Sequence, residues 1–468
     1  MSIAIEEQQK LWQEQYRIVP EQFKKIREIE KVAAVFNTNI DAVVKISGEK
    51  LGKLAASVAF KLSDSDEETR IVKSPKDAVR GIVKCFLKGI AEEWPCYDES
   101  VYEWLKENLN YNNLQIGGQA GIIANLAAAS GVKKVLVHTS SHPQLQAEQF
   151  LAADNLWAVD ENGLPQKASQ INRHQDKPLV HWIIEFLAGD KFSWEGQTFT
   201  CPKSNRFIIT YDEDNMNLRI NKDFGACLCK EGFDYLLMSG YQNLSSERGG
   251  LERIQDCAQL IGKWKKANPQ GIVHLELAST QDKKIRETIL AEIAPLADSI
   301  GLNEREAWDF SEVAVPGMFA KVKSPNLTAP LLFEIISVLK EYCAVSRIQL
   351  HMPGLYMTLQ NEDFKITAEQ NKKGMMLAAT VAAAKASGIK LEKEEDFMYA
   401  HGQNVAEYGI KVLTELASYL GIPNLALTGI SNTENGKLIA IPTILVKNPR
   451  TLVGMGDTIS TLSLIGAR

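Results

Sequence analysis

The second half of the chain repeats a pattern that few folds accommodate, in which short apolar runs alternate with stretches long enough for a helix. Apolar runs of this length predict buried strands at Phe233–Ser239, Gly271–Ala278, Ser299–Leu302, Arg347–Met352 and Leu425–Thr428. Between the first two, Leu251–Lys266 places Leu251, Ile254, Ala258 and Ile261 on one helical face. Alternating strands and helices predict a mostly parallel sheet covered by helices on both sides. In such sheets ligands bind at the carboxyl ends of the strands.

The first half carries related signals but is interrupted twice by strand-rich sequence. Two apolar runs predict buried strands of the main sheet, at Lys31–Asn37 and Lys134–Thr139. A separate set of strands, rich in β-branched and aromatic residues, is predicted at Leu179–Leu187 and Asn205–Thr210. A chain of 468 residues is long enough for more than one structural unit. We therefore expect a large α/β domain from residues 1–40, 112–153 and 224–468, and a smaller β-rich domain from residues 41–111 and 154–223.

Composition excludes several classes of partner. The net charge of -6 provides no global positive field, so nucleic acid is not expected to bind. The longest apolar stretch, Met375–Ala384, is far shorter than the roughly 18 residues that span a bilayer, and the polar segment Glu6–Lys10 does not resemble a signal peptide. The seven cysteines include no C-x-x-C pair, which favours reduced thiols and a cytoplasmic location.

The stretch Thr451–Ser460 combines two glycines and an aspartate ahead of an apolar run. Gly454 and Gly456 leave backbone N–H groups uncovered, so a turn there lets a ligand approach the main chain. The helix expected after the turn adds a positive dipole end that suits an anion such as a transferring phosphoryl group. Asp457 could then accept a proton from an attacking hydroxyl. A glycine-capped helix end with a surface aspartate is the alternative, and this stretch alone does not separate the two.

Two polar clusters follow predicted strands or turns early in the chain. Asn37, Asn39 and Asp41 alternate, so they would share one face if their strand continues, and their side chains suit the adjacent hydroxyls of a sugar. An Asx turn leaving the strand is the alternative, and for this cluster taken alone it is the favoured interpretation. In Gly117–Gly121, paired glycines at a helix start expose backbone amides and Gln119 adds a side-chain amide. Close packing of the helix against a strand is the alternative there.

Two further clusters contain carboxylates. His274 and Glu276 lie two apart on a predicted strand and so share a face, where a carboxylate could hold the water molecules around Mg²⁺. Asn303 followed by Glu306 resembles a capping box at a helix start, and the same pair could order a metal beside a phosphate. The sequence contains no G-x-x-x-x-G-K-[ST], H-E-x-x-H or G-x-S-x-G motif, so P-loop and common hydrolase chemistries have no support.

The order of these clusters resembles the ADP-dependent sugar kinases, which comprise the archaeal-type ADP-dependent glucokinases and phosphofructokinases of the ribokinase-like superfamily. The matching motifs are Asn-x-Asn-x-Asp, Gly-Gly-Gln-Ala-Gly, His-x-Glu, Asn-x-x-Glu and Gly-x-Gly-Asp, and they extend from Asn37 to Ser460. The resemblance implies a ribokinase-like doubly wound α/β domain with a smaller β-rich lid. It also implies the glycolytic transfer of the β-phosphoryl group of ADP to O6 of glucose or O1 of fructose 6-phosphate, with release of AMP.

The resemblance also implies roles for individual residues. It makes Asp457 the general base and Gly454, Met455 and Gly456 the anion hole. It assigns Mg²⁺, or another divalent cation, to Glu276 and Glu306, mostly through water, together with His274 and Asn303. It assigns sugar contacts to Asn39, Asp41, Gly118 and Gln119. The adenine slot carries no signature, although Ile439–Val446 could form a wall of it.

The choice of sugar depends on the lid. Glu93, at the end of the helix expected at Ala78–Glu93, matches a glutamate that holds a sugar hydroxyl in glucose-using members, although a solvated helix-end carboxylate explains it as well. The sequence around residues 202–208 and at Arg219 resembles the lid strands that hold the phosphate of fructose 6-phosphate. The residues that would contact this phosphate are Lys203, Asn205, Arg206 and Arg219. Both sets together predict dual specificity.

Two other functions remain open at this point. One is an ATP-dependent ribokinase-like kinase of another sugar or a nucleoside, and the other is a sugar-binding regulator without catalysis. The expected partners are a small sugar or sugar phosphate and ADP, with no nucleic acid and no membrane, and the protein is expected to be a monomer or a small homo-oligomer.

Overall fold

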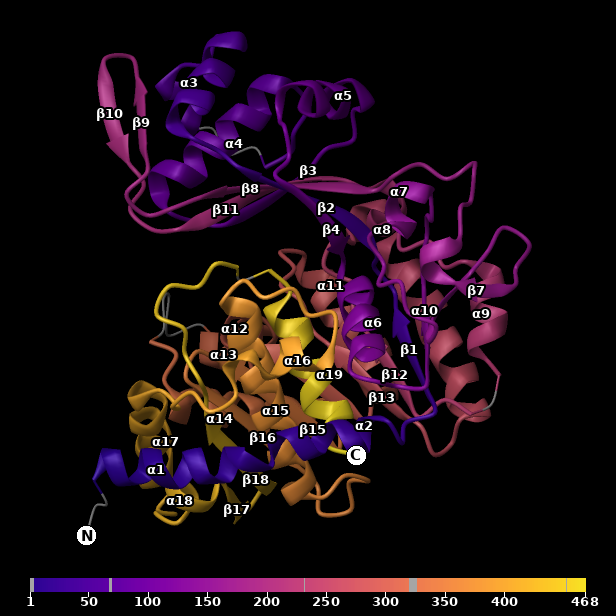
Figure 1. Ribbon diagram of the computed structural model, residues 1–468, viewed down its shortest axis with the longest axis vertical. Coiled ribbons are helices and arrows are strands. Elements are labelled where there is room, and N and C mark those ends of the chain that lie inside the picture. Colours follow the sequence, from indigo (N-terminus) through magenta and orange to yellow (C-terminus); the bar gives the residue numbers. More distant parts are fainter. Residues whose placement is uncertain (1–3, 67–69, 231, 320–325, 452) are drawn as a thin grey trace.

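The computed structural model describes residues 4–66, 70–230, 232–319, 326–451 and 453–468. Within these residues the strands form two large sheets and one hairpin, and the smaller of the two sheets lies above the larger in Figure 1. The larger has eleven strands in the order β17 (Ile430–Thr433), β18 (Gly436–Pro442), β16 (Leu355–Gln360), β15 (Arg347–Met352), β14 (Ser299–Asn303), β13 (Ile272–Glu276), β12 (Tyr235–Met238), β1 (Lys31–Val35), β5 (Lys134–Val137), β6 (Leu156–Val159) and β7 (Pro165–Lys167). The smaller has five, in the order β3 (Glu92–Pro95), β11 (Asn205–Tyr211), β8 (Val180–Phe186), β2 (Asn39–Lys45) and β4 (Asn113–Gly117), and β9 (Lys191–Trp194) pairs with β10 (Gln197–Thr200).

The large sheet is doubly wound around β1. From β1 the parallel strands run outward through β5 and β6 on one side and through β12, β13, β14 and β15 on the other. Antiparallel strands β16, β18 and β17 extend the second side, and antiparallel β7 closes the first. The predicted α/β class is confirmed. One predicted strand is wrong, because Leu425–Thr428 forms the short helix α18, which ends at Gly429 with φ 72°. A run of four apolar residues cannot distinguish a strand from one helical turn.

Helices cover both faces of this sheet. Right-handed crossovers that wind in opposite directions from β1 place their helices on opposite faces. One layer contains α6 (Gln119–Ala129), α15 (Ala368–Ala386) and α19 (Met455–Ile465), which contact one another in turn. The other layer contains α10 (Gly250–Ala267), α11 (Lys283–Thr288), α12 (Glu304–Ala314), α14 (Ala329–Tyr342) and α17 (Glu407–Tyr419).

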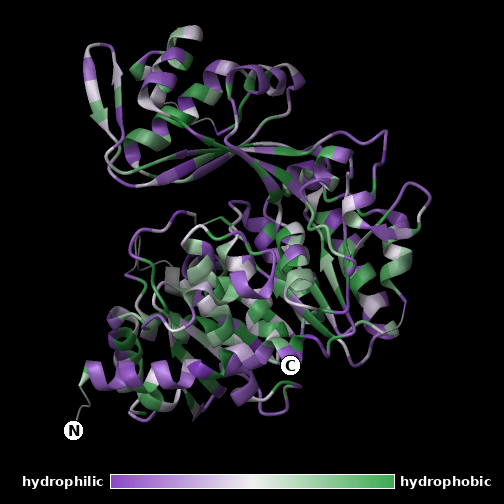
Figure 2. Ribbon diagram, viewed as in Figure 1, coloured by the Kyte–Doolittle hydropathy of each residue, from purple (hydrophilic) through white to green (hydrophobic). Residues whose placement is uncertain are grey.

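Peripheral helices complete the large unit. They are α1 (Ile5–Gln15), α2 (Gln22–Ile26), α7 (Gln144–Ala147), α8 (Glu213–Met216), α9 (Lys222–Leu228), α13 (Pro316–Phe319) and α16 (Glu394–Phe397). Figure 2 shows hydrophobic residues along the central strands and hydrophilic residues along α1. None of the helices in the described part of the chain is long and apolar enough to cross a membrane.

The small sheet has one covered face and one polar face. Helices α3 (Gly48–Ser57), α4 (Pro75–Lys88) and α5 (Glu99–Asn108) bury the covered face in a hydrophobic core separate from that of the large sheet. Side chains alternate along each strand, so Asp41, His181 and Thr210, which pair across β2, β8 and β11, share the other face. Figure 1 shows this sheet above the part of the molecule that contains α12 and α19.

Two local predictions in this region are wrong. The helix expected at Ala78–Glu93 ends earlier, because Gly89 adopts the left-handed conformation (φ 60°) that terminates α4, and Glu93 lies on β3. Asn37 does not share a strand with Asn39 and Asp41, because β1 ends at Val35 and the chain crosses to the small sheet before β2 begins.

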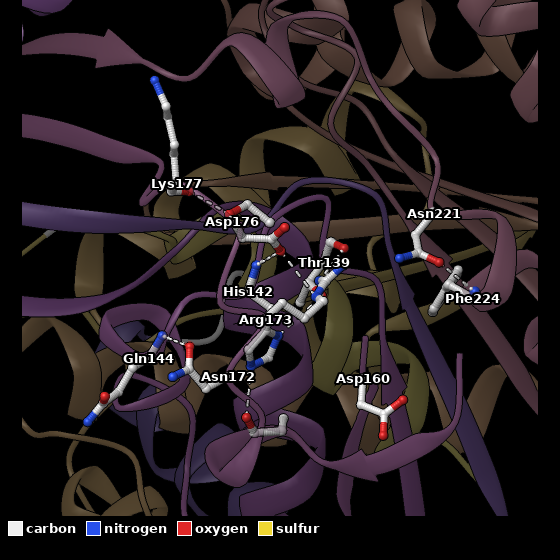
Figure 3. Close-up of polar contacts among 12 residues, drawn as sticks. Thr139, His142, Gln144, Asp160, Asn172, Arg173, Asp176, Lys177, Asn221 and Phe224 are labelled. Carbon is white, nitrogen blue, oxygen red and sulfur yellow. Dashed lines mark hydrogen bonds and ion pairs between the residues drawn. The ribbon is translucent and has the colours of Figure 1, made fainter. Parts of the chain in front are cut away.

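The sheets do not coincide with the expected domain boundaries. Strands β6 and β7 come from residues 154–223 but join the large sheet, whereas β4 comes from residues 112–153 and joins the small one. The segment after β7 returns to the small sheet through a compact polar network (Figure 3). There Asp176 accepts a hydrogen bond from the backbone N–H of His142 (2.7 Å) and pairs with Arg173 (3.2 Å), which also donates to the backbone oxygen of Thr139 (2.9 Å).

Candidate active site

The turn before α19 is built around Gly454, which caps the helix in the left-handed conformation (φ 64°). A Cβ atom there would lie 2.6 Å from Cδ1 of Ile122 and 2.8 Å from Nζ of Lys385, so no other residue fits without a shift. Met455 begins the helix, whose first N–H groups have no partner within it. The preceding Leu452 lies outside the described residues. The geometry is that of a helix N-terminus open to an anion, as the glycine pattern predicts.

Asp457 lies in the first turn of this helix and is buried, with 8% of its surface exposed. Burial raises the pKa of Asp457 to about 6; the positive charge of Lys385 opposes this rise and the negative charge of Asp41 adds to it. A surface aspartate is therefore not what the structure contains. A buried carboxylate that titrates near neutral pH can both accept and release a proton.

A cleft of about 670 Å³ opens in front of the turn. Part of its wall is formed by Gly454, Met455, Gly456 and Asp457. It is also lined by Gln119 of α6 and by Arg206 of the small sheet. An apolar section of the wall is formed by Met352, Pro353, Tyr356, Ala382, Ala383, Ala386, Ile444, Leu445, Val446 and Pro449. The wall of the cleft thus combines polar groups, among them Asp457, with an apolar section that includes part of the expected wall Ile439–Val446.

Glu276 ends β13 beside this cleft. Its side chain is 4% exposed, and Oε2 has no hydrogen-bond partner. Burial raises the pKa of Glu276 well above its usual range, and the charges of Glu306 and Asp457 add to the rise. His274 Nε2 lies 3.4 Å from Oε2 and His351 Nε2 lies 3.9 Å from Oε1. Burial lowers the pKa of both histidines, so they face the carboxylate as neutral rings.

Asn303 and Glu306 form the capping box that their spacing predicts. The side chain of Asn303 accepts from the N–H groups of Arg305 and Glu306 (both 2.9 Å), and Glu306 Oε2 accepts from the N–H of Asn303 (2.8 Å). Burial raises the pKa of Glu306 to about 8, although the hydrogen bond from the N–H of Asn303 acts to lower this pKa. Both residues nevertheless line the cleft, so the structural and functional interpretations are compatible. Within the described part of the chain, no group of three or more His, Cys, Asp or Glu side chains is arranged to hold a metal.

The polar residues of the small sheet form a second group. Its member Asp41 is close enough to raise the pKa of Asp457, although Asp41 and Asn39 are not among the residues that line the cleft. Asn39 Nδ2 donates to Asp41 Oδ1 (2.8 Å), and a Cβ at Gly117 would lie 2.1 Å from that oxygen. Burial raises the pKa of Asp41. Gly118, with φ 71°, turns the chain into α6, where Asn37 and Gln242 both donate to Oε1 of Gln119 (3.2 Å each). The oxygen of Gln119 is thereby engaged, which leaves its NH₂ group to donate to a ligand.

His181 belongs to this side of the site but is not predicted from the sequence. It pairs with Asp41 across β2 and β8, and Nε2 lies 2.9 Å from Oδ2 of Asp212. Burial alone would lower the pKa of His181, but Asp212, Glu93 and Asp41 raise it above its usual value. Glu93 accepts a hydrogen bond from Thr210 (2.6 Å) on the same face. The alternation of Leu179–Leu187 could have identified His181, since it faces opposite to its neighbour Trp182.

The four predicted phosphate contacts lie in different surroundings. Arg206 lines the cleft and pairs across the sheet with Glu185. Lys203 is exposed, and Asn205 donates its side-chain amide to the backbone oxygen of Gly89 (2.9 Å). Arg219 pairs with Asp214 (2.8 Å) and Glu213 (3.7 Å). Roles for Lys203, Asn205 and Arg219 therefore stay predictions.

Sequence reasoning also misses Lys385 and His351. His351 is the penultimate residue of a correctly predicted strand, so the rule that ligands bind at strand ends could have found it. Lys385 lies in the last turn of α15, an alanine-rich helix with no motif. Only the folded chain brings it to the glycine turn.

Comparisons with known proteins identify the family of the chain. The model of the ADP-specific phosphofructokinase/glucokinase conserved region matches residues 30–466. An ADP-specific phosphofructokinase of Pyrococcus abyssi is 29% identical over 93% of this chain and 96% of its own length. An ADP-dependent glucose/glucosamine kinase of Pyrococcus furiosus is 29% identical over 97% of this chain and 98% of its own.

Solved structures give the same result. The last common ancestor of ADP-dependent phosphofructokinases from Methanosarcinales has a TM-score of 0.82 and 29% identity, and covers 99% of both chains. An ADP-dependent kinase in complex with fructose-6-phosphate and ADPβS also has a TM-score of 0.82, with 27% identity over 100% of this chain and 98% of its own. The family model extends over almost the whole chain, and the protein belongs to the ADP-specific phosphofructokinase/glucokinase family.

Proposed function

We propose that this phosphotransferase moves the β-phosphoryl group of ADP to O1 of fructose 6-phosphate, to O6 of glucose, or to both, and releases AMP. The observation that carries the proposal is the position of Asp457. It is buried at the N-terminus of α19, behind the glycine turn and close enough to Asp41 for each charge to disfavour the other. A sugar held by Asn39, Asp41 and Gln119 would present a hydroxyl to this carboxylate.

The chemistry follows from these positions. Asp457 accepts the proton of the sugar hydroxyl, whose oxygen forms a bond to the β-phosphorus while the bond from that phosphorus to the bridging oxygen breaks. The N–H groups of the Gly454–Gly456 turn hold the oxygens of the transferring group. Phosphoryl transfer depends mainly on positioning and charge stabilisation, and both are supplied by preformed parts of the fold. Closure of the small sheet over the cleft would exclude water that would otherwise hydrolyse the donor.

A divalent cation, with Mg²⁺ as the first candidate, fits the acidic side of the cleft. Oε2 of Glu276 is a buried acceptor without a partner, and Glu306 lines the same wall. Mg²⁺ prefers oxygen ligands and retains several waters, which suits two carboxylates that act together with ADP phosphates rather than a closed protein cage. When bound, the cation neutralises charge on the phosphates. His274 and Asn303 would orient the two carboxylates.

The apolar end of the cleft is the proposed adenine site. Ile444, Leu445 and Val446 form one part of its wall, and Met352, Pro353 and Tyr356 another. An apolar slot of this kind accepts a planar base, while the polar end near Gly454 accepts phosphates. Ile439 lies in the core strand β18 rather than in this wall, so the proposed slot is shorter than Ile439–Val446.

Dual specificity is proposed from the small sheet. Glu93 and Asp41 both act on the charge of His181, which places the three groups together on the face where a neutral sugar would bind. Arg206, the second residue of β11, lines the cleft, and its guanidinium could pair with a sugar phosphate. A glucose hydroxyl and a phosphate dianion thus each have a partner.

Initial rates with ADP or ATP against glucose and fructose 6-phosphate test this proposal. We expect ADP to be preferred and both sugars to be phosphorylated. Glu93→Gln should reduce kcat/KM for glucose more than for fructose 6-phosphate, and Arg206→Gln should do the reverse. Activity on one sugar alone would refute dual specificity, faster turnover with ATP would favour the ATP-dependent kinase, and no turnover with any pair would favour the non-catalytic regulator.

The cellular setting is part of the same proposal. All seven cysteines are free thiols, which supports the expected cytoplasmic location. A monomer or small homo-oligomer stays the prediction for assembly.

A further inference from the structure

Lys385 is a half-buried cation beside the glycine turn that no motif identifies. It lies in the last turn of α15 and donates to the backbone oxygen of Gly454 (2.9 Å) and to Oγ1 of Thr458 (3.1 Å). Thr458 in turn donates its hydroxyl to the same backbone oxygen (2.7 Å). The three groups close a small hydrogen-bonded ring that uses two of the three N–H donors of the ammonium group.

The ring acts on one peptide unit. The carbonyl of Gly454 and the N–H of Met455 belong to the same planar group, so a cation that fixes the oxygen also fixes the direction of the N–H. A charged donor on the carbonyl polarises the peptide and makes its N–H a stronger donor to an anion on the opposite side. Met455 N–H is the first N–H of α19 and lies at the edge of the cleft.

The surroundings of Lys385 favour this role over simple packing. Its neighbours on α15, Ala382, Ala383 and Ala386, line the cleft, while its own Nζ points to the back of the turn, close to where a Gly454 side chain would lie. Burial lowers the pKa of Lys385 to about 8, although the charges of Asp457 and Asp41 oppose the change. Lys385 is not among the residues that line the cleft, so we place its ammonium group behind the glycine turn rather than in the path of the substrates.

We propose that Lys385 is a positioning residue of the phosphoryl-transfer site, which aligns and polarises the Gly454–Met455 peptide so that its N–H group meets the transferring phosphoryl. The inference rests on the proposed function. It concerns a stabilisation that increases as charge develops on the transferring group, so it predicts an effect on kcat rather than on the binding of ADP or sugar.

The test compares Lys385→Met and Lys385→Gln, which remove the charge, with Lys385→Arg, which keeps it. We expect the neutral variants to lose roughly 10 to 100-fold in kcat, with KM for ADP and sugar within about 3-fold, because one preorganised donor is weakened. The arginine variant should recover most of the loss. Lys372→Met is the matched control: Lys372 lies on the same helix and donates to the backbone oxygen of Thr428 (3.2 Å), away from the cleft.

Unfolding temperature and the dissociation constants of ADP and sugar are measured on all four variants. The proposal is overturned if the neutral Lys385 variants keep kcat within about 2-fold, if they change KM alone, if Lys385→Arg recovers nothing, or if Lys372→Met loses as much. If Lys385→Met does not fold, Lys385→Gln decides, because it retains a hydrogen-bond donor of similar reach. Failure of the wild-type protein to phosphorylate either sugar would instead refute the proposed function.

Discussion

At the scale of single residues, Asp457 is the proposed general base because three features meet at one carboxylate. It is buried, it lies at a helix N-terminus, and its pKa responds to the positive charge of Lys385 and the negative charge of Asp41. A structural aspartate would need only one of these surroundings. The combination is the kind of perturbed environment in which general bases occur.

Asp457→Asn removes the base with little change of shape. We expect kcat to fall by at least roughly 10²-fold, since a positioned base contributes about that much or more, while KM for both substrates changes little. Steady-state rates with ADP and each sugar measure the effect. Asp256→Asn, an exposed aspartate of α10 paired with Arg253, serves as the control and should keep full activity. A near-normal rate for Asp457→Asn would remove this residue from the mechanism.

The raised pKa of Asp457 gives the rate a defined pH dependence. A base must be ionised to accept a proton, and its pKa of about 6 places the acid limb about two pH units above that of an ordinary aspartate. The logarithm of kcat/KM should therefore fall with slope one as pH decreases through about 6. A profile of kcat/KM from pH 4.5 to 8.5, at saturating divalent cation, checks this. A limb near pH 4 would mean that burial does not perturb the base.

At the scale of elements, the sequence predicts strands and helices well where periodic patterns are long and poorly where a single residue redirects the chain. The repeating strands at Ser299 and Arg347 and the helix at Leu251 are found where expected. The Asn37–Asp41 cluster was expected on one strand, yet the chain changes sheet within it. No local sequence pattern predicts that crossing, because the crossing depends on which sheet each strand joins.

The same limit applies to the site. The glycine turn and the carboxylates carry local signals, since helix starts and strand ends have recognisable residues. His181 and Lys385 reach the site only through pairing across the small sheet and packing between α15 and α19. Histidine and lysine occur in many strands and helices, so these two residues can be identified as part of the site only from their position in the fold and not from their spacing in the sequence.

Gly118 allows a test of how the start of helix α6 affects stability and sugar binding. Its φ of 71° is unfavourable for other residues, and a Cβ would lie 2.5 Å from the backbone oxygen of Asn37. Gly118→Ala should lower the free energy of unfolding by about 1–3 kcal/mol and weaken sugar binding by displacing Gln119. Urea denaturation and KM for each sugar measure the two effects. Gly52→Ala in α3, where a Cβ meets nothing within 4 Å, should be neutral or slightly stabilising. Equal stability of the two variants would contradict the account.

At the scale of the whole molecule, two sheets with separate cores share one site. The chain crosses between them after β1, after β4, after β7 and after β11, so several crossings must adjust together if the small sheet moves against the large one. Residues that line the cleft come from both sides, with Arg206 from the small sheet and Glu276 and Asp457 from the large unit. We therefore expect substrate affinity to depend on how often the two sides are close.

One contact between the two sides can be removed without touching the cleft. The guanidinium of Arg248, just before α10, lies 4.0 Å from the ring centroid of Tyr97, which follows β3 of the small sheet. An exposed cation–π contact contributes about 0.5–1 kcal/mol. A mutation can shift the closed population by no more than that amount, which corresponds to roughly 2 to 5-fold in affinity.

Tyr97→Leu should raise KM for sugar by about this factor, with kcat almost unchanged, and should increase the radius of gyration of the ligand-free protein in small-angle X-ray scattering. Tyr399→Leu is the control, because Tyr399 is also an exposed tyrosine (56%, against 43% for Tyr97) and lies in the large unit. If both variants keep the wild-type KM and radius of gyration, the contact has no part in bringing the two sides together, and closure depends on the substrates alone.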